Sequence, residues 1–362
     1  MSGEPLLCLI GTFPPPVHGQ AAVNEAVRKR VAEAGSPHVV INLAGASLER
    51  GWRTRLKRIG AFGSGLASLL KLALERRRLT IYMSVSGGWG QLYEACFASV
   101  GRAVDARMFL HHHSFAYLDE RRTLTALLAW IAGPEATHVV LCERMARLLR
   151  ERYTPVRQVM EISNAGLVDP PSGEATPRPA LKTLAFLSNV SREKGVLRFL
   201  DVIEALRRER LGLRARIAGP FQDAEIESTV RQRLARLGEG VEYLGARYGE
   251  EKRRFFLEAD ALLYPSDYVN EAEPLVIWEA VSQGLPVVAW GRGCIGQMLS
   301  DGAGAAVPVA EDFLPDAVGR VKEWISRPDL FTEASRRAAE SFAHRRRAAE
   351  AGAATLIRLL TS

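Results

Sequence analysis

Short apolar runs alternate with longer amphipathic stretches along this chain of 362 residues, and that alternation limits the fold more than any other feature. Runs such as Leu6–Ile10, Thr80–Ser84 and Ala261–Tyr264 have the length of buried strands. The stretches between them have the periodicity of helices that bury one face. Because strands that alternate with helices are typical of βα units around a parallel sheet, the sequence predicts an α/β fold.

The predicted elements form two groups, one on each side of Pro170–Pro179, a segment with the composition of an exposed linker. The first group has strands at 6–10, 39–42, 80–84, 107–111 and 138–142 and a helix at about 21–34. The second has strands at 183–187, 214–218, 242–244, 261–264 and 286–290, helices that begin near 194, 226, 250 and 274, and only helix after 290. We expect two Rossmann-like domains, residues 1–168 and 183–339, joined by a linker at 169–182, with ligands in a cleft between them.

The formal net charge of +7 suits three kinds of partner: nucleic acid, an anionic membrane or a phosphorylated substrate. Nucleic acid is the least expected, because the chain has no recognisable nucleic-acid motif and no aromatic–basic platform. The segment Arg50–Leu74 combines Arg and Lys with Trp and aliphatic residues. It is either an element that lies on anionic lipid or a solvated helix that covers the sheet.

No membrane span or secretion signal is predicted. The longest apolar stretch, Ile59–Leu74, is shorter than the roughly 20 residues that a span requires. Leu6–Gly11 is too short for a signal peptide and has no basic residues before it. We therefore expect a cytoplasmic protein, placed at the inner face of the cytoplasmic membrane if Arg50–Leu74 binds lipid.

Residues 264–289, YPSDYVNEAEPLVIWEAVSQGLPVVA, are the most informative segment. Pro274 suits the first turn of a helix, and Gly284 suits the stop just beyond it. The free N–H groups of Leu275 and Val276 would then point towards the ends of the strands, where a helix start attracts phosphate. Glu279 would be placed to accept two sugar hydroxyls, as acidic residues do in dinucleotide sites.

This segment resembles the signature of the retaining GT-B glycosyltransferases of family four. The resemblance rests on Glu271 and Glu279, with seven residues between them, and on the residues that follow, Ala280, Gly284, Pro286, Val287 and Val288. Upstream, the family's phosphate-binding stretch is similar to Leu187-Ser188-Asn189 and Glu193-Lys194-Gly195. The order and rough spacing of the family also fit Ala218-Gly219, Val241–Gly245 and Ala259–Ser266. The resemblance covers the second half of the chain well and the first half more loosely.

The resemblance implies a retaining hexosyltransferase with a GT-B fold, in which two domains face each other across a cleft. A C-terminal helix, about residues 340–362, would cross back onto the first domain. The substrates would be a nucleoside-diphosphate sugar and a glycan or lipid-linked saccharide, in bacterial surface polysaccharide biosynthesis. The resemblance implies no divalent metal and no other cofactor.

The resemblance also implies roles for single residues. Glu279 would hold the ribose of the donor, and Glu271 would contact hydroxyls of the donor sugar near the reacting carbon. Lys194 would stabilise the charge that develops on the departing diphosphate, more strongly in the transition state than in the ground state. The full predicted donor-binding set is Gly19, Asn189, Arg192, Lys194, Gly219, Glu271, Pro274, Leu275, Val276 and Glu279.

The sequence departs from the family pattern at two places in the second half. Asn189 stands where the family has an arginine, five residues before the lysine, and Arg192 is a candidate to supply that charge. Glu273-Pro274 replaces the family's Phe-Gly after the first glutamate. These departures concern the contacts to the donor sugar more than those to the nucleotide.

In the first half, Gly19 follows the first strand where the family has a glycine-rich loop, and His18 takes the place of a second glycine. His111, His112 and His113 follow the strand at 107–111, and adjacent strand residues alternate faces, so no metal site is predicted. The family has a histidine there that faces the donor sugar. His112 is the first candidate, but His111 and His113 stay open, as does a structural role.

Other functions stay open beside this one. Glu271 and Glu279 could be a glycosidase pair, although a position at a helix start suits ligand binding better. A nucleotide-sugar enzyme that is no transferase would turn over the donor without an acceptor product. An inactive homologue would bind the nucleotide only, and a nucleic-acid-binding protein would show strongly salt-dependent affinity.

Overall fold

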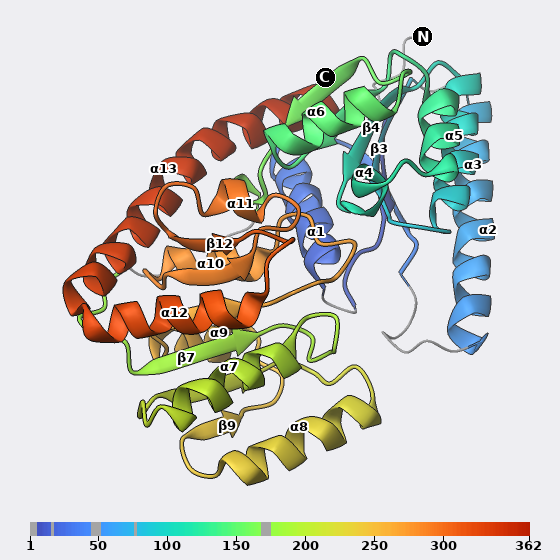
Figure 1. The fold of residues 1–362 in the computed structure, drawn as a ribbon. Coiled ribbons are helices and arrows are strands. Elements are labelled where there is room, and N and C mark those ends of the chain that lie inside the picture. Colours follow the sequence, from blue (N-terminus) through green and yellow to red (C-terminus); the bar gives the residue numbers. More distant parts are fainter. Residues whose placement is uncertain (1–5, 16–17, 45–51, 76–77, 168–174) are drawn as a thin grey trace. The chain divides into compact units, whose positions relative to one another are not determined.

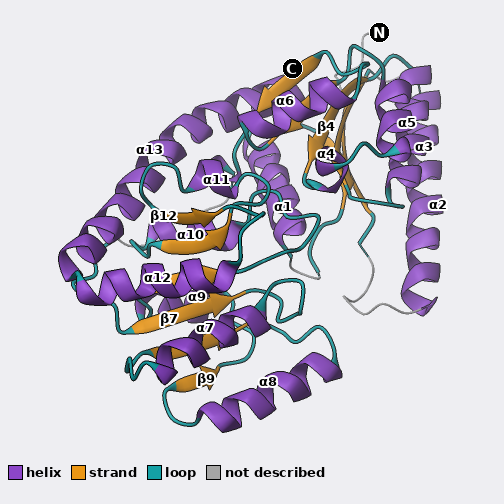
Figure 2. Ribbon diagram, viewed as in Figure 1, coloured by secondary structure: helices purple, strands orange, loops and turns teal. Residues whose placement is uncertain are grey.

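The computed structural model describes residues 6–15, 18–44, 52–75, 78–167 and 175–362, and only the backbone of residues 52–58. The chain divides into two compact units, residues 1–168 with 348–362 and residues 169–347. Each unit contains a six-stranded parallel sheet flanked by helices (Figures 1 and 2). The predicted α/β fold with two sheets is therefore confirmed.

The first unit has the strand order β2-β1-β3-β4-β5-β6. Its strands are β1 (Leu6–Gly11), β2 (His38–Asn42), β3 (Leu79–Val85), β4 (Arg107–His112), β5 (Thr137–Val140) and β6 (Gln158–Glu161). Its helices are α1 (Gly19–Glu33), α2 (Trp52–Leu74), α3 (Gln91–Ala103), α4 (Ala116–Asp119), α5 (Thr123–Ala132), α6 (Glu143–Arg152) and the 3₁₀ turn η1 (Asn164–Gly166).

Helices cover both faces of this first sheet, and its central strands are therefore buried along their whole length. Every residue of β3 is buried, as expected for a strand between two layers. Helices α2, α3 and α5 lie on one face and α1 on the other (Figure 1). The Phe62 ring of α2 stacks on Tyr93 of α3 at 4.5 Å between centroids. In the described ranges, no helix is long and apolar enough to cross a bilayer.

The second unit has the strand order β12-β11-β10-β7-β8-β9. Its strands are β7 (Thr183–Leu187), β8 (Arg214–Ala218), β9 (Val241–Tyr243), β10 (Ala261–Tyr264), β11 (Val287–Trp290) and β12 (Gly304–Val307). Its helices are α7 (Val196–Arg208), α8 (Ala224–Leu237), α9 (Gly249–Leu257), α10 (Leu275–Ser282), α11 (Ile295–Met298), α12 (Phe313–Ser326) and most of α13 (Pro328–Thr361). Aromatic side chains of the helices, including Phe199, Phe313 and Phe331, complete the core on the sheet.

Two strands were missing from the predicted set, β6 and β12. Each is the outermost strand of its sheet, so it needs fewer apolar residues than a central strand. The sequences Gln-Val-Met-Glu of β6 and Gly-Ala-Ala-Val of β12 accordingly lack a clear apolar run. The expectation of helix alone after residue 290 is thus wrong at 304–307.

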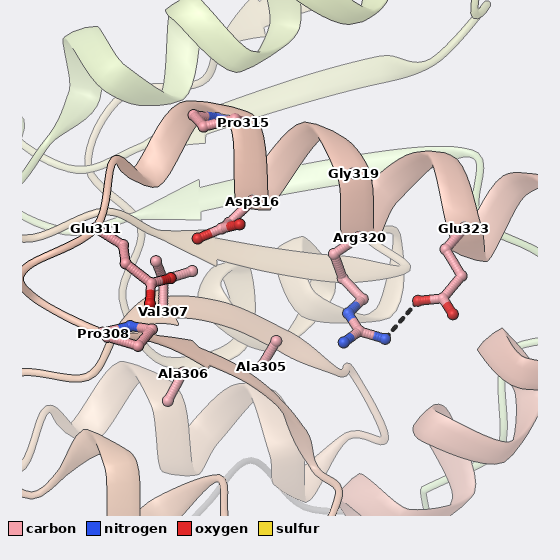
Figure 3. A pocket seen from close by; sticks show the side chains of 10 residues that line it. All are labelled: Ala305, Ala306, Val307, Pro308, Glu311, Pro315, Asp316, Gly319, Arg320 and Glu323. Carbon is pink, nitrogen blue, oxygen red and sulfur yellow. Dashed lines mark hydrogen bonds and ion pairs between the residues drawn. The ribbon is translucent and has the colours of Figure 1, made fainter.

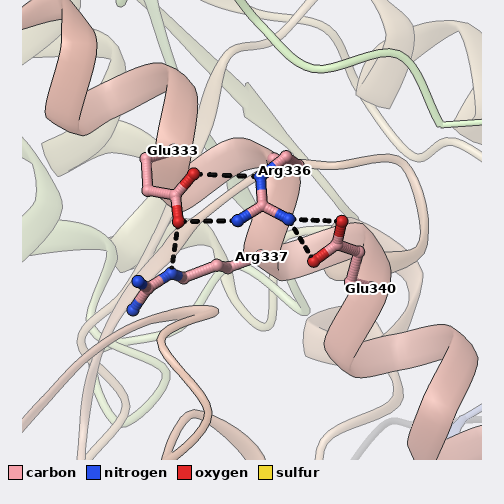
Figure 4. Close-up of polar contacts among 4 residues, drawn as sticks. All are labelled: Glu333, Arg336, Arg337 and Glu340. Atoms are coloured by element: carbon pink, nitrogen blue, oxygen red, sulfur yellow. Dashed lines mark hydrogen bonds and ion pairs between the residues drawn. The ribbon is translucent and has the colours of Figure 1, made fainter.

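Helix α13 serves both units. Its exposed surface in the second unit carries a network in which Glu333 and Glu340 bind Arg336, and Glu333 also binds Arg337 (Figure 4). Its last part, residues 348–362, belongs to the first unit. There it lies against Gly166, where a Cβ would come within 2.3 Å of the Ala349 carbonyl group. Glycine at position 166 therefore permits the close approach of this helix.

Candidate donor site and neighbouring loops

In the second unit, the loop after β10 brings three hydrogen-bond donors to one oxygen of Glu271. Its Oε2 accepts from the Lys194 ammonium at 2.7 Å and from the hydroxyls of Tyr264 and Ser266, each at 2.8 Å. The Glu271 side chain is buried. Its other oxygen has no hydrogen-bond partner in the described part of the chain. The carboxylate is thus fixed from one side and left with an acceptor for a ligand.

Lys194 is held beside this loop by the backbone at Gly195. Gly195 has φ +86°, and a Cβ there would lie 2.0 Å from the Pro265 carbonyl oxygen, so only glycine allows this approach. The Lys194 ammonium also lies 4.4 Å from the Tyr268 ring centroid. Burial lowers the pKa of Lys194, but Tyr264 and Glu271 outweigh it and hold the pKa above its ordinary value. The side chain therefore stays a fixed cation.

Glu279 lies in the second turn of α10 and is buried. Its Oε1 forms an ion pair with the ammonium of Lys252, which comes from α9. Burial raises the pKa of Glu279, and the charge of Lys252 acts in the opposite direction. The sequence analysis missed Lys252, because this contact joins residues 27 positions apart that no motif connects.

The start of α10 agrees with the predicted helix within one residue. Pro274 is the residue before the first turn, and Leu275 and Val276 begin the helix. Pro274, the residue at the cap position, forms no side-chain hydrogen bond to this helix start. The exposed Asn189 and the turn at Gly219 lie at the ends of β7 and β8. At Gly219, φ is +132° and a Cβ would come within 1.7 Å of the Ser188 carbonyl oxygen.

Arg192 does not join Lys194 and Glu271. Its guanidinium lies 3.7 Å from Glu225 of α8, and both side chains are exposed. Within the described residues, the cation in the Glu271 cluster is Lys194 alone. Lys194, from the segment between β7 and α7, therefore contacts Glu271 in the loop that leads from β10 to α10, while Arg192 extends away from them.

In the first unit, the three adjacent histidines occupy different surroundings. The ring of His112 is buried and both of its nitrogens are engaged, by the Tyr117 hydroxyl at 2.8 Å and by His138 at 2.9 Å. The ring of His111 is buried against the Tyr82 hydroxyl at 2.6 Å. Burial lowers the pKa of both side chains, so both rings are neutral. His112, the first candidate from the sequence, is thus part of the interior of this unit.

His113 lies one residue beyond the end of β4 and is only half-buried. Its ring lies against that of His111, tilted by 45° with 4.1 Å between centroids, and its Nε2 has no partner in the described residues. Burial, with a smaller contribution from nearby His18, lowers the pKa of His113 to about 3. His113 is therefore a neutral imidazole at the carboxyl end of the sheet, near the start of α1.

Gly19 is the first residue of α1, directly after His18, which caps the helix by accepting from the Ala21 N–H at 3.3 Å. A Cβ at Gly19 would meet no atom within 4 Å among the described residues. The structure therefore shows no close backbone approach that requires glycine at this position. Part of the preceding loop, residues 16–17, lies outside the described residues.

The loop after β3, residues 86–90, is supported by side chains of α3. The buried carboxylate of Glu94 accepts from the Ser86 N–H at 2.9 Å, and the Gln91 amide donates to the Ser86 carbonyl at 3.0 Å. Burial raises the pKa of Glu94 to about 8, so this carboxyl group is largely protonated at neutral pH. The loop carries Trp89, whose side chain is 80 % exposed.

Two cavities lie apart from these residues. One, of about 390 Å³ beside β12 and α12, includes Glu311, Asp316 and the ion pair Arg320–Glu323 (Figure 3). The other, of about 440 Å³, lies at the amino ends of β4 and β5. Neither is lined by a residue predicted from the sequence. The described residues contain no group of three or more His, Cys, Asp or Glu that could hold a metal ion.

Comparison with known proteins finds a family match within the second unit. Residues 181–322 match the family described as Glycosyl transferases group 1. No curated protein sequence matches the chain. Among solved structures, sucrose-phosphate synthase (tll1590) from Thermosynechococcus elongatus is 15 % identical, with a TM-score of 0.70 over 99 % of this chain and 98 % of that one.

Two further structures have the same fold. HepE (Alr3699) from Anabaena, solved in complex with UDP, is 15 % identical, with a TM-score of 0.70 over 98 % of this chain and all of that one. WaaG, a glycosyltransferase involved in lipopolysaccharide biosynthesis, is 12 % identical, with a TM-score of 0.62 over 99 % of this chain and all of that one. At such identities the likeness establishes the fold, and the predicted GT-B fold is confirmed.

Proposed function

We propose that this chain, whose residues 181–322 match the family Glycosyl transferases group 1, is a retaining glycosyltransferase that uses a nucleoside-diphosphate sugar. One observation carries the proposal. Glu271 and Glu279, with seven residues between them, are both buried, and each has one oxygen bound to a lysine while the other has no partner in the described residues. Two such carboxylates beside a helix start suit the hydroxyls and phosphates of a nucleotide sugar.

The second unit would bind the donor. Glu279 accepts hydroxyls of the ribose, and Glu271 accepts hydroxyls of the sugar. The bond from the anomeric carbon to the diphosphate breaks, and a bond to the oxygen of an acceptor hydroxyl forms on the same face. The proton of that hydroxyl passes to the departing diphosphate. The departing nucleoside diphosphate gains negative charge, which the Lys194 ammonium and the N–H groups at the start of α10 stabilise. No divalent metal and no other cofactor has a part in this proposal.

The first unit would bind the acceptor, and its carboxyl-end loops suit that task. Among the three histidines we assign the donor-facing role to His113, because it is only half-buried and its Nε2 has no partner in the described residues. His111 is fully buried, and the nitrogens of His112 are both engaged. A neutral imidazole can accept a hydrogen bond from a sugar hydroxyl. Trp89, exposed on the loop after β3, offers a flat apolar face to a sugar ring.

The acceptor class is a glycan or a lipid-linked saccharide, in bacterial surface polysaccharide synthesis. The work of WaaG in lipopolysaccharide biosynthesis supports this class. Contact with the inner face of the cytoplasmic membrane would give access to a lipid-linked acceptor. That contact is supported by α2, on which Ile59, Leu70 and Leu74 form an exposed apolar stripe.

A nucleotide panel tests the donor assignment. Wild type and Glu279→Ala are melted with UDP, GDP, ADP, CMP and TDP, with UDP first because HepE was solved with UDP and with UDP-glucose. A ligand at 100 times its Kd should stabilise the wild type by about 2.7 kcal/mol, and Glu279→Ala should lose most of that gain. Glu227→Ala, at an exposed ion pair on α8, is the matched control and should respond like the wild type.

The outcomes separate the alternative functions. If no nucleotide stabilises the wild type, the proposal fails, and binding to nucleic acid at several salt concentrations is then measured. Stabilisation without any turnover of a nucleotide sugar would indicate an inactive homologue. Turnover of the donor without a glycosylated product would indicate another kind of nucleotide-sugar enzyme.

A further inference from the structure

Lys252 meets the proposed ribose-binding glutamate from a different element. It lies on α9, and its ammonium forms an ion pair with Oε1 of Glu279 on α10. The Glu279 side chain is only 10 % exposed and that of Lys252 is 27 % exposed. The second oxygen, Oε2, has no hydrogen-bond partner among the residues that the structure describes.

We infer that Lys252 is a positioning residue for nucleotide recognition: it holds Glu279 as a carboxylate and occupies Oε1, so that Oε2 accepts the hydroxyls of the nucleoside's ribose. The inference rests on the proposed function, since it takes Glu279 to bind ribose. Lys252 itself does not need to touch the nucleotide in this arrangement. Its effect on binding passes through the charge and the orientation of Glu279.

The physical reason is the cost of a buried charge. A carboxylate removed from water without a partner takes up a proton, because burial penalises the charged form. Burial does raise the pKa of Glu279, and Lys252 is the charged group that offsets this effect. A protonated Glu279 would present a hydroxyl group and would lose part of its capacity to accept from a ribose diol.

The other titratable groups near α10 are engaged elsewhere. Tyr264 at the end of β10 and Glu271 in the following loop both contact Lys194. Within the described residues, Lys252 is therefore the one charged side chain that contacts Glu279. Loss of Lys252 would leave the carboxylate with no cation in contact.

The arrangement repeats the one at Glu271. There Oε2 accepts hydrogen bonds from Lys194, Tyr264 and Ser266, and Oε1 has no partner in the described residues. Both glutamates thus have a lysine on one oxygen and a free acceptor on the other. The two differ in support, because Glu271 also has two hydroxyl donors on Oε2, whereas among the described residues Lys252 is the one side chain that binds the Glu279 carboxylate.

The test is the pH dependence of UDP binding, measured by calorimetry on the full chain from pH 7.5 to 8.5. The diphosphate is ionised throughout this range and the uracil N3–H keeps its proton, so the ligand contributes almost no titration. We expect a nearly constant Kd in the wild type. In Lys252→Met we expect a Kd weakened by about tenfold at pH 7.5, the factor that one pKa unit represents, and recovery as Glu279 ionises at higher pH.

Three further variants isolate the cause. Lys252→Arg should restore the wild-type Kd, because it keeps the charge. The double variant Lys252→Met/Glu279→Gln should bind weakly with no pH dependence, because an amide does not titrate. Lys252→Gln is a second neutral variant in case Lys252→Met does not fold, and each variant is first melted without ligand.

The inference is overturned if Lys252→Met and Lys252→Gln bind UDP as the wild type does, or if they lose affinity equally at every pH. These failures are distinct from a failure of the proposed function. If the wild type binds UDP and Glu279→Ala does not, the function stands whatever Lys252 does. If the wild type binds none of the panel nucleotides, both the function and this inference fall.

Discussion

At the scale of single residues, Lys194 combines two tasks that other sites divide between side chains. It anchors one oxygen of Glu271, and it supplies the cation of that cluster in the described residues. Replacement by methionine removes the charge but keeps the apolar stem. Because the charge on the departing diphosphate would then be poorly stabilised, we expect kcat to fall by about 10²–10³-fold.

The measurement is the release of nucleoside diphosphate from the nucleotide sugar. Lys182→Met is the control, since Lys182 is exposed just before β7 and away from Glu271, and it should keep full activity. Turnover of Lys194→Met at the wild-type rate would show that Lys194 does not stabilise the leaving group.

Residues that a family motif marks were predictable from the sequence, and residues joined only by the fold were not. Glu271, Glu279 and Lys194 stand out in the sequence through spacing and family likeness, and the structure places Lys194 against Glu271. Lys252 has no such signal, because its partner lies on another helix. The choice among the three histidines also required structure, since only packing shows that the nitrogens of His112 are engaged.

At the scale of elements, the loop after β3 is fixed well enough to present a side chain. Ser86 is held at both its N–H and its carbonyl by Glu94 and Gln91 of α3. An aromatic face on a fixed loop loses little entropy when it stacks on a sugar. We therefore expect Trp89→Ala to raise the acceptor KM by about tenfold, as for a lost contact of ~1.4 kcal/mol, with nucleotide binding unchanged.

The acceptor for this assay is found by screening oligosaccharides for nucleoside diphosphate release. Trp130→Ala is the matched control, because Trp130 is also exposed in the first unit but lies on α5. Equal effects of the two substitutions, or a loss of nucleotide affinity in Trp89→Ala, would contradict an acceptor role for Trp89.

Central elements were easier to predict than those at the margins. The buried β7 and β10 have the predicted bounds, since a strand covered on both faces must be apolar throughout. Each of the outer strands β6 and β12 is defined by its pairing with one neighbouring strand. Such pairing does not require the apolar run by which a strand is predicted from the sequence. Helix starts shifted by one or two residues, as at α1 and α7, where capping and a left-handed Gly195 set the start.

At the scale of the whole molecule, charge and exposed apolar surface bear on where the protein works. The net charge of +7 favours an anionic surface or an anionic substrate. On helix α2, Phe62 and Leu69 pack against the rest of the first unit, while Ile59, Leu70 and Leu74 are exposed. Separations of 11 and 4 residues place these three on one face of the helix. The basic side chains at 53–58 of the same helix lie outside the described residues.

This stripe predicts binding to anionic vesicles. The apolar side chains would enter the interface between headgroups and acyl chains, and each basic residue near the surface would add about 1 kcal/mol. We expect the full chain to sediment with vesicles of phosphatidylcholine and phosphatidylglycerol, less with phosphatidylcholine alone, and less in high salt. Leu70→Glu/Leu74→Glu should release it, whereas Leu257→Glu, at an exposed leucine of the second unit, should not. Equal sedimentation of the double variant and the wild type would mean that α2 is only a cover for the sheet, and the acceptor would then have to be reached without this helix on lipid.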